Sequence, residues 1–231
     1  MKNVKRRPMP DILRKNSKKW TQNLLDAITE FRTTGKKIPD SVKNKYKHDE
    51  VLDVLKQIYN DGYGTYYCCY CETQIEPVSF PHIEHRKPKE QDRFPEDAFN
   101  WDNLHLSCQT CNMAKGTKWD AKNKILDAVN DVPIKKHLGY RVEMPEGVFR
   151  ETLTKRGITT ENHTDLNRKS LRIARLKIWH SIIKRIQEIN SFGDGPRAHT
   201  AKKILIEKCK GIHGSLIKWI LIEWKVIGES E

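Results

Sequence analysis

Four of the six cysteines in this sequence form two pairs with the same spacing. Two residues separate Cys68 from Cys71, and two separate Cys108 from Cys111. A closed structural Zn²⁺ site needs four tetrahedral ligands, and thiolates at this spacing supply them two at a time. One ion held by both pairs would close the long loop between them, and its binding energy would contribute to folding. The spacing therefore predicts a structural Zn²⁺ site.

The two remaining cysteines do not fit this pattern. Cys69 and Cys71 have the wrong spacing for a ligand pair, and Cys209 stands alone. A lone cysteine is more often a small buried hydrophobic residue, and we favour that interpretation for Cys209. The alternative for the four paired cysteines, ordinary thiols without a metal, leaves their repeated spacing unexplained.

The segment between the cysteine pairs holds residue types suited to metal-dependent phosphodiester hydrolysis. His85 directly follows Glu84, and Asn112 directly follows Cys111. A neutral imidazole with a pKa of roughly 6.5 can take a proton from water, whereas Mg²⁺ prefers oxygen ligands. We therefore assign His85 as a candidate general base. Glu84 and Asn112 are candidate ligands of a catalytic divalent metal.

Further side chains in this segment can support the same chemistry. Asn103 is suited to hydrogen-bond the backbone and so hold the loop that carries His85. Lys115 and Arg86 are candidates for contact with a nucleic-acid phosphate. Two more histidines, His82 and His105, are also present, but a lone histidine is usually a surface or core residue, and we favour that interpretation for both.

From Tyr66 to Lys118 the order of these residues resembles the HNH, or His-Me finger, nucleases. The tracts IEHRKPK and NLHLSCQTCNMAKG are similar, more narrowly, to the HNH component of Septu and retron antiphage systems. The sequence departs from the commonest HNH pattern in two places. Glu84 stands where Asp is usual, and Asn112 stands where a second His often stands. Both residues keep an oxygen ligand available, so the departures affect the coordination and not the reaction class.

The resemblance implies more than the residues do by themselves. It implies a β-β-α unit that holds one catalytic divalent metal, Mg²⁺ or Mn²⁺, beside the structural Zn²⁺. It also implies a partner, an ATPase of the ABC/SMC-like type. In retron forms a reverse transcriptase with its RNA–DNA hybrid joins them.

The composition favours a polyanionic partner. The chain has 231 residues, a net charge of +13 and a sequence pI near 9.4, and nucleic acid is the first candidate for a chain this basic. No apolar run reaches the roughly 18 residues of a membrane span, and no signal peptide is evident, so no membrane association is expected. Zinc-type cysteines without a secretion signal point to the cytoplasm.

The N-terminal stretch is the most basic part of the chain. Residues 1–20 contain eight Lys or Arg and a single acid, and Pro8 and Pro10 argue against a helix there. This stretch is either an arm that contacts nucleic-acid backbone or a tail, solvated or docking a partner, and the sequence leaves both open.

Apolar periodicity predicts helices along much of the chain. In the long C-terminal helix, Arg168, Arg172 and Arg175 form one stripe that can face phosphates or cover a hydrophobic neighbour. Short strands are expected at 66–67 and 83–86, and residues 137–151 show weak alternation around a turn at 145–147. The predicted helices are 21–34, 49–59, one that begins near Gln109, 122–129, 166–189, about 197–209 and 214–227.

Together these features predict a mainly α fold with a small ββα-metal (HNH/His-Me finger) unit stapled by a four-cysteine zinc site. We divide the chain into a basic arm with N-terminal helices (1–62), the zinc-bound HNH unit (63–118) and a C-terminal helical region (119–231). The predicted function is metal-dependent endonucleolytic cleavage, with DNA as the first substrate and an antiphage role implied by resemblance alone. The alternatives are an RNase that cleaves tRNA, a zinc-built nucleic-acid-binding module without catalysis, and an interaction protein whose basic charge serves docking.

Overall fold

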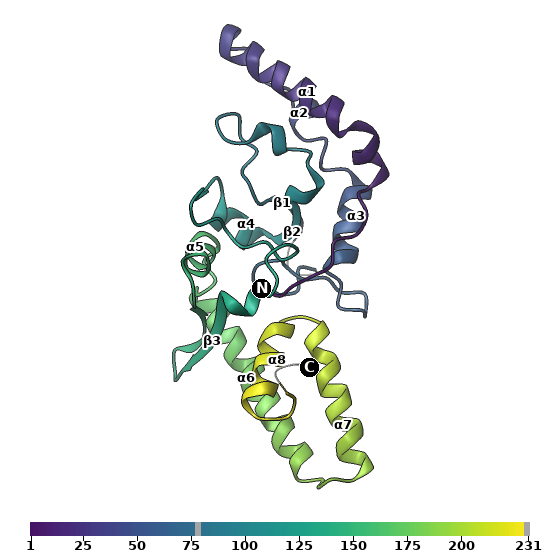
Figure 1. Cartoon of the computed structure of the whole chain (residues 1–231), viewed down its shortest axis with the longest axis vertical. Helices are drawn as coiled ribbons and strands as arrows, with labels where there is room; N and C mark the ends of the chain where they lie inside the picture. The colour runs from purple at the N-terminus through teal and green to yellow at the C-terminus, as the bar shows by residue number, and fades with distance from the viewer. Residues whose placement is uncertain (77–79, 229–231) are drawn as a thin grey trace.

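The structure, a computed structural model, describes residues 1–76 and 80–228. Figure 1 shows an elongated molecule, with α1 and α2 at one end, a small hairpin and α4 in the middle, and α6 and α7 at the other end. The predicted mainly α fold is confirmed. The helices are α1 Asp11–Thr34, α2 Asp40–Lys43, α3 Asp49–Ile58, α4 Gln109–Lys115, α5 Lys155–Thr164, α6 Lys169–Asn190, α7 Pro196–Glu207 and α8 Gly214–Glu223.

Four strands form two antiparallel hairpins. They are β1 Pro81–His85, β2 Leu104–Cys108, β3 Leu138–Glu143 and β4 Gly147–Thr152. In the first hairpin His85 lies opposite Leu104, and Glu84 lies opposite His105. Helix α4 begins directly after β2 and packs against both strands. These three elements form the predicted β-β-α unit.

Helix α1 begins ten residues before the predicted start. Pro10 has an extended backbone and precedes the first helical residue, Asp11. Proline is compatible with this position because the first N–H groups of a helix have no intrahelical partner. The expectation that prolines keep residues 11–20 non-helical is therefore wrong, since they mark where the helix starts.

The first seven residues are packed against the body of the protein and do not form a free tail. Met1 is buried, and Val4 N donates to Ala128 O at 3.0 Å. Arg6 Nη1 donates to Leu104 O on β2 at 2.8 Å. The prediction of a solvated tail is wrong for this segment.

Two expectations between residues 119 and 165 also differ from the structure. Residues 122–129 form turns instead of a helix, because the Asp127 carboxylate accepts hydrogen bonds from Val129 N and Asn130 N. Conversely, α5 was not predicted, since its threonines lower helix propensity. The Thr154 hydroxyl caps this helix by accepting from Gly157 N at 3.1 Å.

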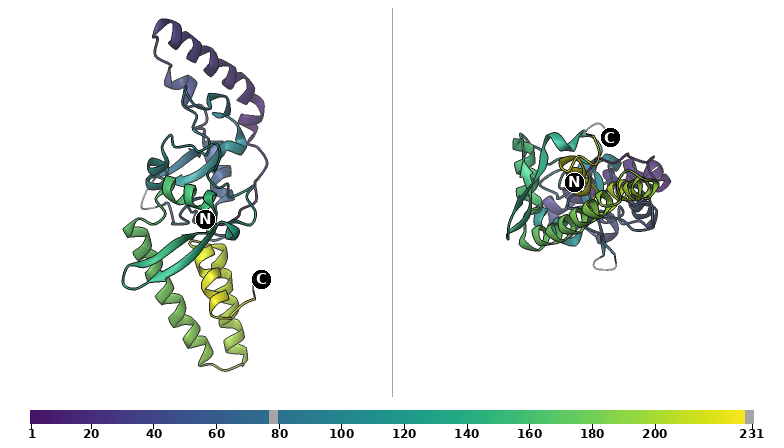
Figure 2. Two further views of the ribbon diagram at one scale, coloured as in Figure 1. Left: turned by 60° about the vertical axis from the view of Figure 1, so that its left-hand side comes forward. Right: turned by 90° about the horizontal axis from the view of Figure 1, so that it is seen from below.

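The weakly alternating residues 137–151 form the second hairpin, which lies along α6 in Figure 2. Arg175 on α6 is buried beneath this hairpin and donates to Val148 O at 3.4 Å. The Arg172 guanidinium lies 4.5 Å from the centroid of the Phe149 ring. These two members of the arginine stripe therefore cover hydrophobic neighbours.

Buried apolar side chains gather in two clusters. The first extends from Met1 to Leu171 and includes the β1–β2 hairpin, whereas the second joins β3 and β4 to α6, α7 and α8. Ile125, Leu126 and Ile134 belong to the first cluster, so packing continues across the predicted boundary at residue 118. Among the described residues, no helix is long and apolar enough to span a membrane.

Candidate active site and zinc centre

The four paired cysteines meet in one buried cluster. Their sulfur atoms all lie within 4.8 Å of one another, and Cys71 Sγ is 3.8 Å from Cys108 Sγ. Ligands about 2.3 Å from a tetrahedral Zn²⁺ stand about 3.8 Å apart, so the cluster fits this ion. The first pair lies in the loop after α3. Cys108 ends β2, and Cys111 lies in the first turn of α4. The site therefore joins the loop before β1 to the junction between β2 and α4.

Two groups outside the cluster donate toward its sulfurs. Tyr70 N lies 3.4 Å from Cys68 Sγ, and Arg168 Nη1 lies 3.6 Å from Cys111 Sγ. Donors of this kind stabilise thiolate charge and orient the ligands of a metal. Because Arg168 immediately precedes α6, it also ties the C-terminal helices to the zinc centre.

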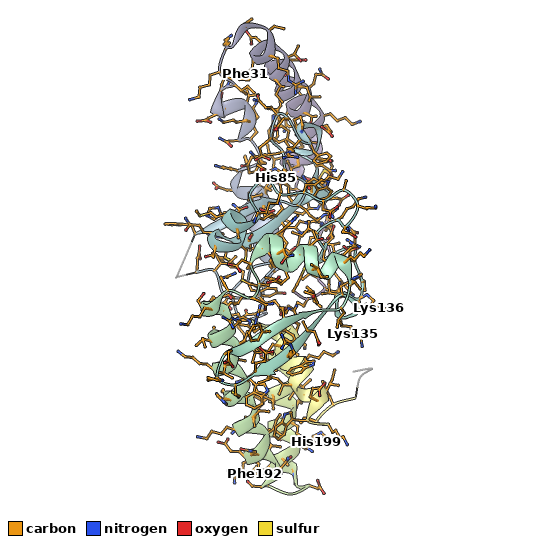
Figure 3. The ribbon with its side chains drawn as sticks, turned by 90° about the vertical axis from the view of Figure 1, so that its left-hand side faces the viewer. Phe31, His85, Lys135, Lys136, Phe192 and His199 are labelled. Atoms are coloured by element: carbon orange, nitrogen blue, oxygen red, sulfur yellow. The ribbon has the colours of Figure 1, made fainter. Side chains whose placement is uncertain are left out.

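His85 is the last residue of β1, and its ring is held from two sides. Nε2 lies 2.9 Å from Ala98 O, and the ring of Tyr46 approaches edge-on at 4.4 Å between centroids. A carbonyl only accepts, so Nε2 carries the proton and Nδ1 keeps its lone pair. Nδ1 receives no hydrogen bond from any residue that the structure describes. Figure 3 shows His85 between Phe31 and Phe192, nearer to Phe31.

Burial makes the His85 imidazole neutral. Desolvation lowers the pKa of His85 to about 3, and the charges of Lys89 and Lys115 act in the same direction. The hydrogen bond to the Ala98 carbonyl opposes this shift. A neutral ring with an available Nδ1 lone pair is the protonation state of a general base, and the lowered pKa makes this ring a weaker base than a solvated imidazole.

Asn103 is buried and bonds only to backbone within the described part of the chain. Its Oδ1 accepts from Lys87 N at 2.7 Å, and its Nδ2 donates to Lys87 O at 3.0 Å and to Asp97 O at 3.1 Å. Lys87 follows His85 by two residues. The orienting role predicted for Asn103 requires an arrangement of this kind.

Glu84 is buried on the face of β1 that meets α4. Its carboxylate lies 2.7 Å from Lys115 Nζ and accepts from the Tyr70 hydroxyl at 3.2 Å. Burial raises the pKa of Glu84 to about 6, although the Lys115 charge opposes this rise. Lys115 Nζ also donates to His85 O at 2.7 Å. An ammonium group therefore already neutralises the predicted metal-binding carboxylate.

Asn112 lies beside His82, one turn before Lys115 on α4. Asn112 Nδ2 is 3.2 Å from His82 Nδ1, so the amide oxygen is not used in this contact. His82 and Glu84 share one face of β1, because alternate residues of a strand point the same way. Glu84 and Asn112 offer oxygen atoms suited to Mg²⁺ or Mn²⁺. In this structure the Lys115 ammonium occupies the Glu84 carboxylate.

The two cations predicted to contact phosphate are engaged within the protein, Lys115 fully buried and Arg86 only partly exposed. Lys115 is buried in its pair with Glu84. Arg86 donates to Ile125 O at 3.2 Å, and its Nε lies 3.4 Å from the carboxylate of Asp127. Both side chains hold the unit together here, and their contact with phosphate stays a prediction. Asp127 lies near Arg86 because the turns after α4 pack back against the β-β-α unit. The sequence around Arg86 does not indicate this contact.

Two lysines that we did not predict from the sequence, Lys47 and Lys89, lie near His82 and His85. Lys89 Nζ is 5.4 Å from the centre of the Tyr46 ring, which packs on His85. Burial lowers the pKa of Lys89, and the charges of Lys47 and Lys43 lower it further. Lys47 also lowers the pKa of His82, after the larger effect of burial. The density of lysines from 43 to 47 was the available signal.

Residues 68–118 match the family model for HNH endonuclease. This range contains both cysteine pairs, His85 and the two asparagines, so the β-β-α unit with its cysteine cluster is an HNH endonuclease domain. Within that class the chain resembles Septu protein PtuB. It is 39% identical to PtuB of Bacillus thuringiensis over 67 residues, which are 29% of this chain and 25% of the relative.

A second PtuB, from Bacillus mycoides (strain KBAB4), is 35% identical over 78 residues, with 29% of this chain and 25% of the relative covered. The chain thus spans about a quarter of the length of the curated relatives that it matches. No solved structure matches it significantly.

Proposed function

We propose that this chain is a metal-dependent HNH endonuclease that hydrolyses phosphodiester bonds of DNA, as the effector of a Septu-type antiphage system. The observation that carries the proposal is the state of His85 inside an HNH domain. Its imidazole is neutral, its tautomer is set by the Ala98 carbonyl, and Nδ1 is available to accept a proton. A zinc module that only bound nucleic acid would need none of these features.

The residues divide the work as follows in this proposal. His85 takes a proton from the attacking water through Nδ1, while Asn103 holds the loop that follows it. Glu84 and Asn112 hold Mg²⁺ or Mn²⁺, which supplies positive charge to the scissile phosphate when bound. Lys47 and Lys89 add positive charge next to the histidines.

Lys115 has a particular part in this scheme. Its ammonium and a divalent cation would compete for the same carboxylate of Glu84, since both need close contact with its oxygen atoms. We therefore propose that binding of the cation releases Lys115 from Glu84. The released ammonium would then be free to contact phosphate, the role that its position after Asn112 first suggested.

The antiphage role and the partner rest on similarity to Septu protein PtuB and to its wider family. We propose that the chain acts in the cytoplasm with a separately encoded ATPase of the ABC/SMC-like type. A reverse transcriptase with its RNA–DNA hybrid joins this complex if the system is a retron. Exposed apolar side chains on the C-terminal helices support a docking role there, including Ile204 at 55% and Trp224 at 42% exposure. Co-expression with neighbouring open reading frames and gel filtration tests this claim, and a chain that elutes alone and cleaves at full rate contradicts it.

A cleavage assay on two substrates tests the function itself. The purified chain is incubated with supercoiled plasmid and with total tRNA, each with Mg²⁺, with Mn²⁺ and without added cation. We expect nicked and linear plasmid only with a divalent cation. Cleavage of tRNA alone would replace DNA with RNA as the substrate. If the zinc-loaded chain binds nucleic acid yet leaves both substrates intact, also with the co-expressed ATPase and nucleotide, the nuclease proposal is wrong.

A further inference from the structure

A basic cavity lies where the N-terminal segment crosses the HNH domain. Its volume is about 520 Å³, and its wall includes residues from that segment, α3, the first cysteine loop and the link between α7 and α8. No carboxylate contributes to the lining among the described residues. The five cationic side chains in the wall are Lys2, Lys5, Arg6, Arg7 and Lys210.

Two of these cations fix the wall in place. Arg6 donates to Leu104 O on β2, as described above, and Lys2 donates to Gly211 O at 2.9 Å. Lys2 Nζ also lies 4.1 Å from the centre of the Tyr67 ring. The N-terminal segment is thereby attached both to the HNH hairpin and to the C-terminal helices.

The other three cations are exposed. The side chains of Lys5 and Arg7 form no hydrogen bond or ion pair with any residue that the structure describes. Lys210 pairs with Glu207 at 2.7 Å, and such exposed pairs are weak. Like charges gathered around one cavity repel one another, and the negative charge of a bound polyanion relieves this repulsion. Binding also releases counterions condensed on the polyanion, which favours the complex further.

The position of the cavity connects it to the cleavage site. Leu104, which accepts from Arg6, is the register partner of His85 on β1. Arg6, which forms part of the cavity wall, therefore connects the cavity to the hairpin that carries the candidate base. The other large cavity, between α1 and the loop after β1, includes Glu90 and Asp92 in its lining and is less suited to an anion.

We propose that this basic cavity binds the phosphodiester backbone of the nucleic-acid substrate outside the cleavage site. The proposal deepens the nuclease function and rests on it for the identity of the ligand. It assigns to Lys5, Arg7 and Lys210 contacts with phosphate groups, while Lys2 and Arg6 build the wall. The N-terminal segment is then a fixed part of the substrate-binding surface.

A salt titration of binding tests this proposal. The full-length, zinc-loaded chain binds a fluorescein-labelled DNA duplex in buffer without added divalent cation, so that cleavage does not interfere. The test variant combines Lys5→Glu, Arg7→Glu and Lys210→Glu. The matched control combines Lys177→Glu, Lys184→Glu and Lys203→Glu, three exposed positions on α6 and α7 with the same change in net charge. Zinc content and circular dichroism verify that both variants are folded.

We expect the slope of log Kobs against log salt concentration to become shallower by about 2 to 3 in the test variant, since each lost phosphate contact removes about 0.9. The control should keep the wild-type slope. Equal weakening in both variants would show a general charge effect and overturn the proposal, as would wild-type binding by the test variant. A wild-type chain that binds the duplex but never cleaves it would refute only the nuclease function.

Discussion

The pair between Lys115 and Glu84 gives the sharpest physical prediction about the site. Both side chains are almost fully buried, and their charged atoms are 2.7 Å apart. Lys115→Met removes the ammonium but keeps a chain of similar length. The Glu84 carboxylate then has only the Tyr70 hydroxyl as a described partner. We expect this variant to lose about 3–5 kcal/mol of unfolding free energy at pH 7, the usual cost of leaving one charge of a buried pair without its partner.

The pH dependence of this loss has a defined sign. With Lys115 present, the pKa of Glu84 is already raised to about 6, chiefly by burial. Without Lys115 this pKa rises further, so the folded variant protonates Glu84 more readily. A carboxyl whose pKa is raised on folding destabilises the protein above that pKa and not below its ordinary pKa of about 4.3. The difference between wild type and Lys115→Met should therefore shrink as the pH falls from 7 toward 5.

Denaturant unfolding of a double-mutant cycle measures the coupling. The second single variant is Glu84→Gln, and the double variant replaces both charges with neutral groups. If the pair is coupled as described, the double variant is more stable than the sum of the two single losses predicts by about 2 kcal/mol. Additive losses, or a Lys115→Met variant as stable as wild type at pH 7, would refute the buried pair and with it the competition between Lys115 and a divalent cation.

Three further predictions concern the metal centres and one buried histidine, His213. The purified chain should contain about one zinc, and Cys108→Ser should lose zinc and soluble fold together by metal analysis and circular dichroism, because binding and folding are coupled; a well-folded wild type without zinc contradicts the site. Asn112→Ala should weaken Mn²⁺ binding at constant zinc content, measured calorimetrically, and unchanged affinity would remove Asn112 from the ligands. Burial lowers the pKa of His213 to about 4, so its folded form resists a proton that the unfolded chain accepts below about 6.5. The wild type therefore loses unfolding free energy as the pH falls from about 6.5 toward 4. In this range His213→Gln should lose about 1.4 kcal/mol less unfolding free energy per pH unit than the wild type. Parallel profiles of unfolding free energy against pH would contradict this assignment.

The sequence predicted the parts of the site that depend on local spacing. Two Cys-x-x-Cys pairs are sufficient to indicate one tetrahedral cluster, because each short turn points two sulfurs at one ion. Helix α4 and the strand that carries His85 were also predictable from periodicity and from the order of residues around them.

Partners that approach from distant segments could not be predicted. Tyr46 packs on His85 from the link between α2 and α3, and Asp127 pairs with Arg86 from the turns after α4. Such contacts depend on how separate segments pack, and no residue pattern near His85 or Arg86 encodes them. The position of the N-terminal segment could not be predicted for a related reason. Its charges left open an arm that contacts nucleic acid or a tail, whereas the burial of Met1 and the hydrogen bond from Arg6 to β2 fix it in place.

The most direct test of the central claim is the single-turnover rate of plasmid cleavage by His85→Ala. His180→Ala, at an exposed position on α6, is the matched control. Both variants should retain zinc, fold and affinity for nucleic acid. We expect His85→Ala to cleave about 10²–10⁴-fold more slowly than wild type with Mg²⁺ or Mn²⁺, the usual effect of losing a general base, while His180→Ala cleaves at the wild-type rate. Wild-type cleavage by His85→Ala would contradict the assignment of His85 as the base and the mechanism built on it.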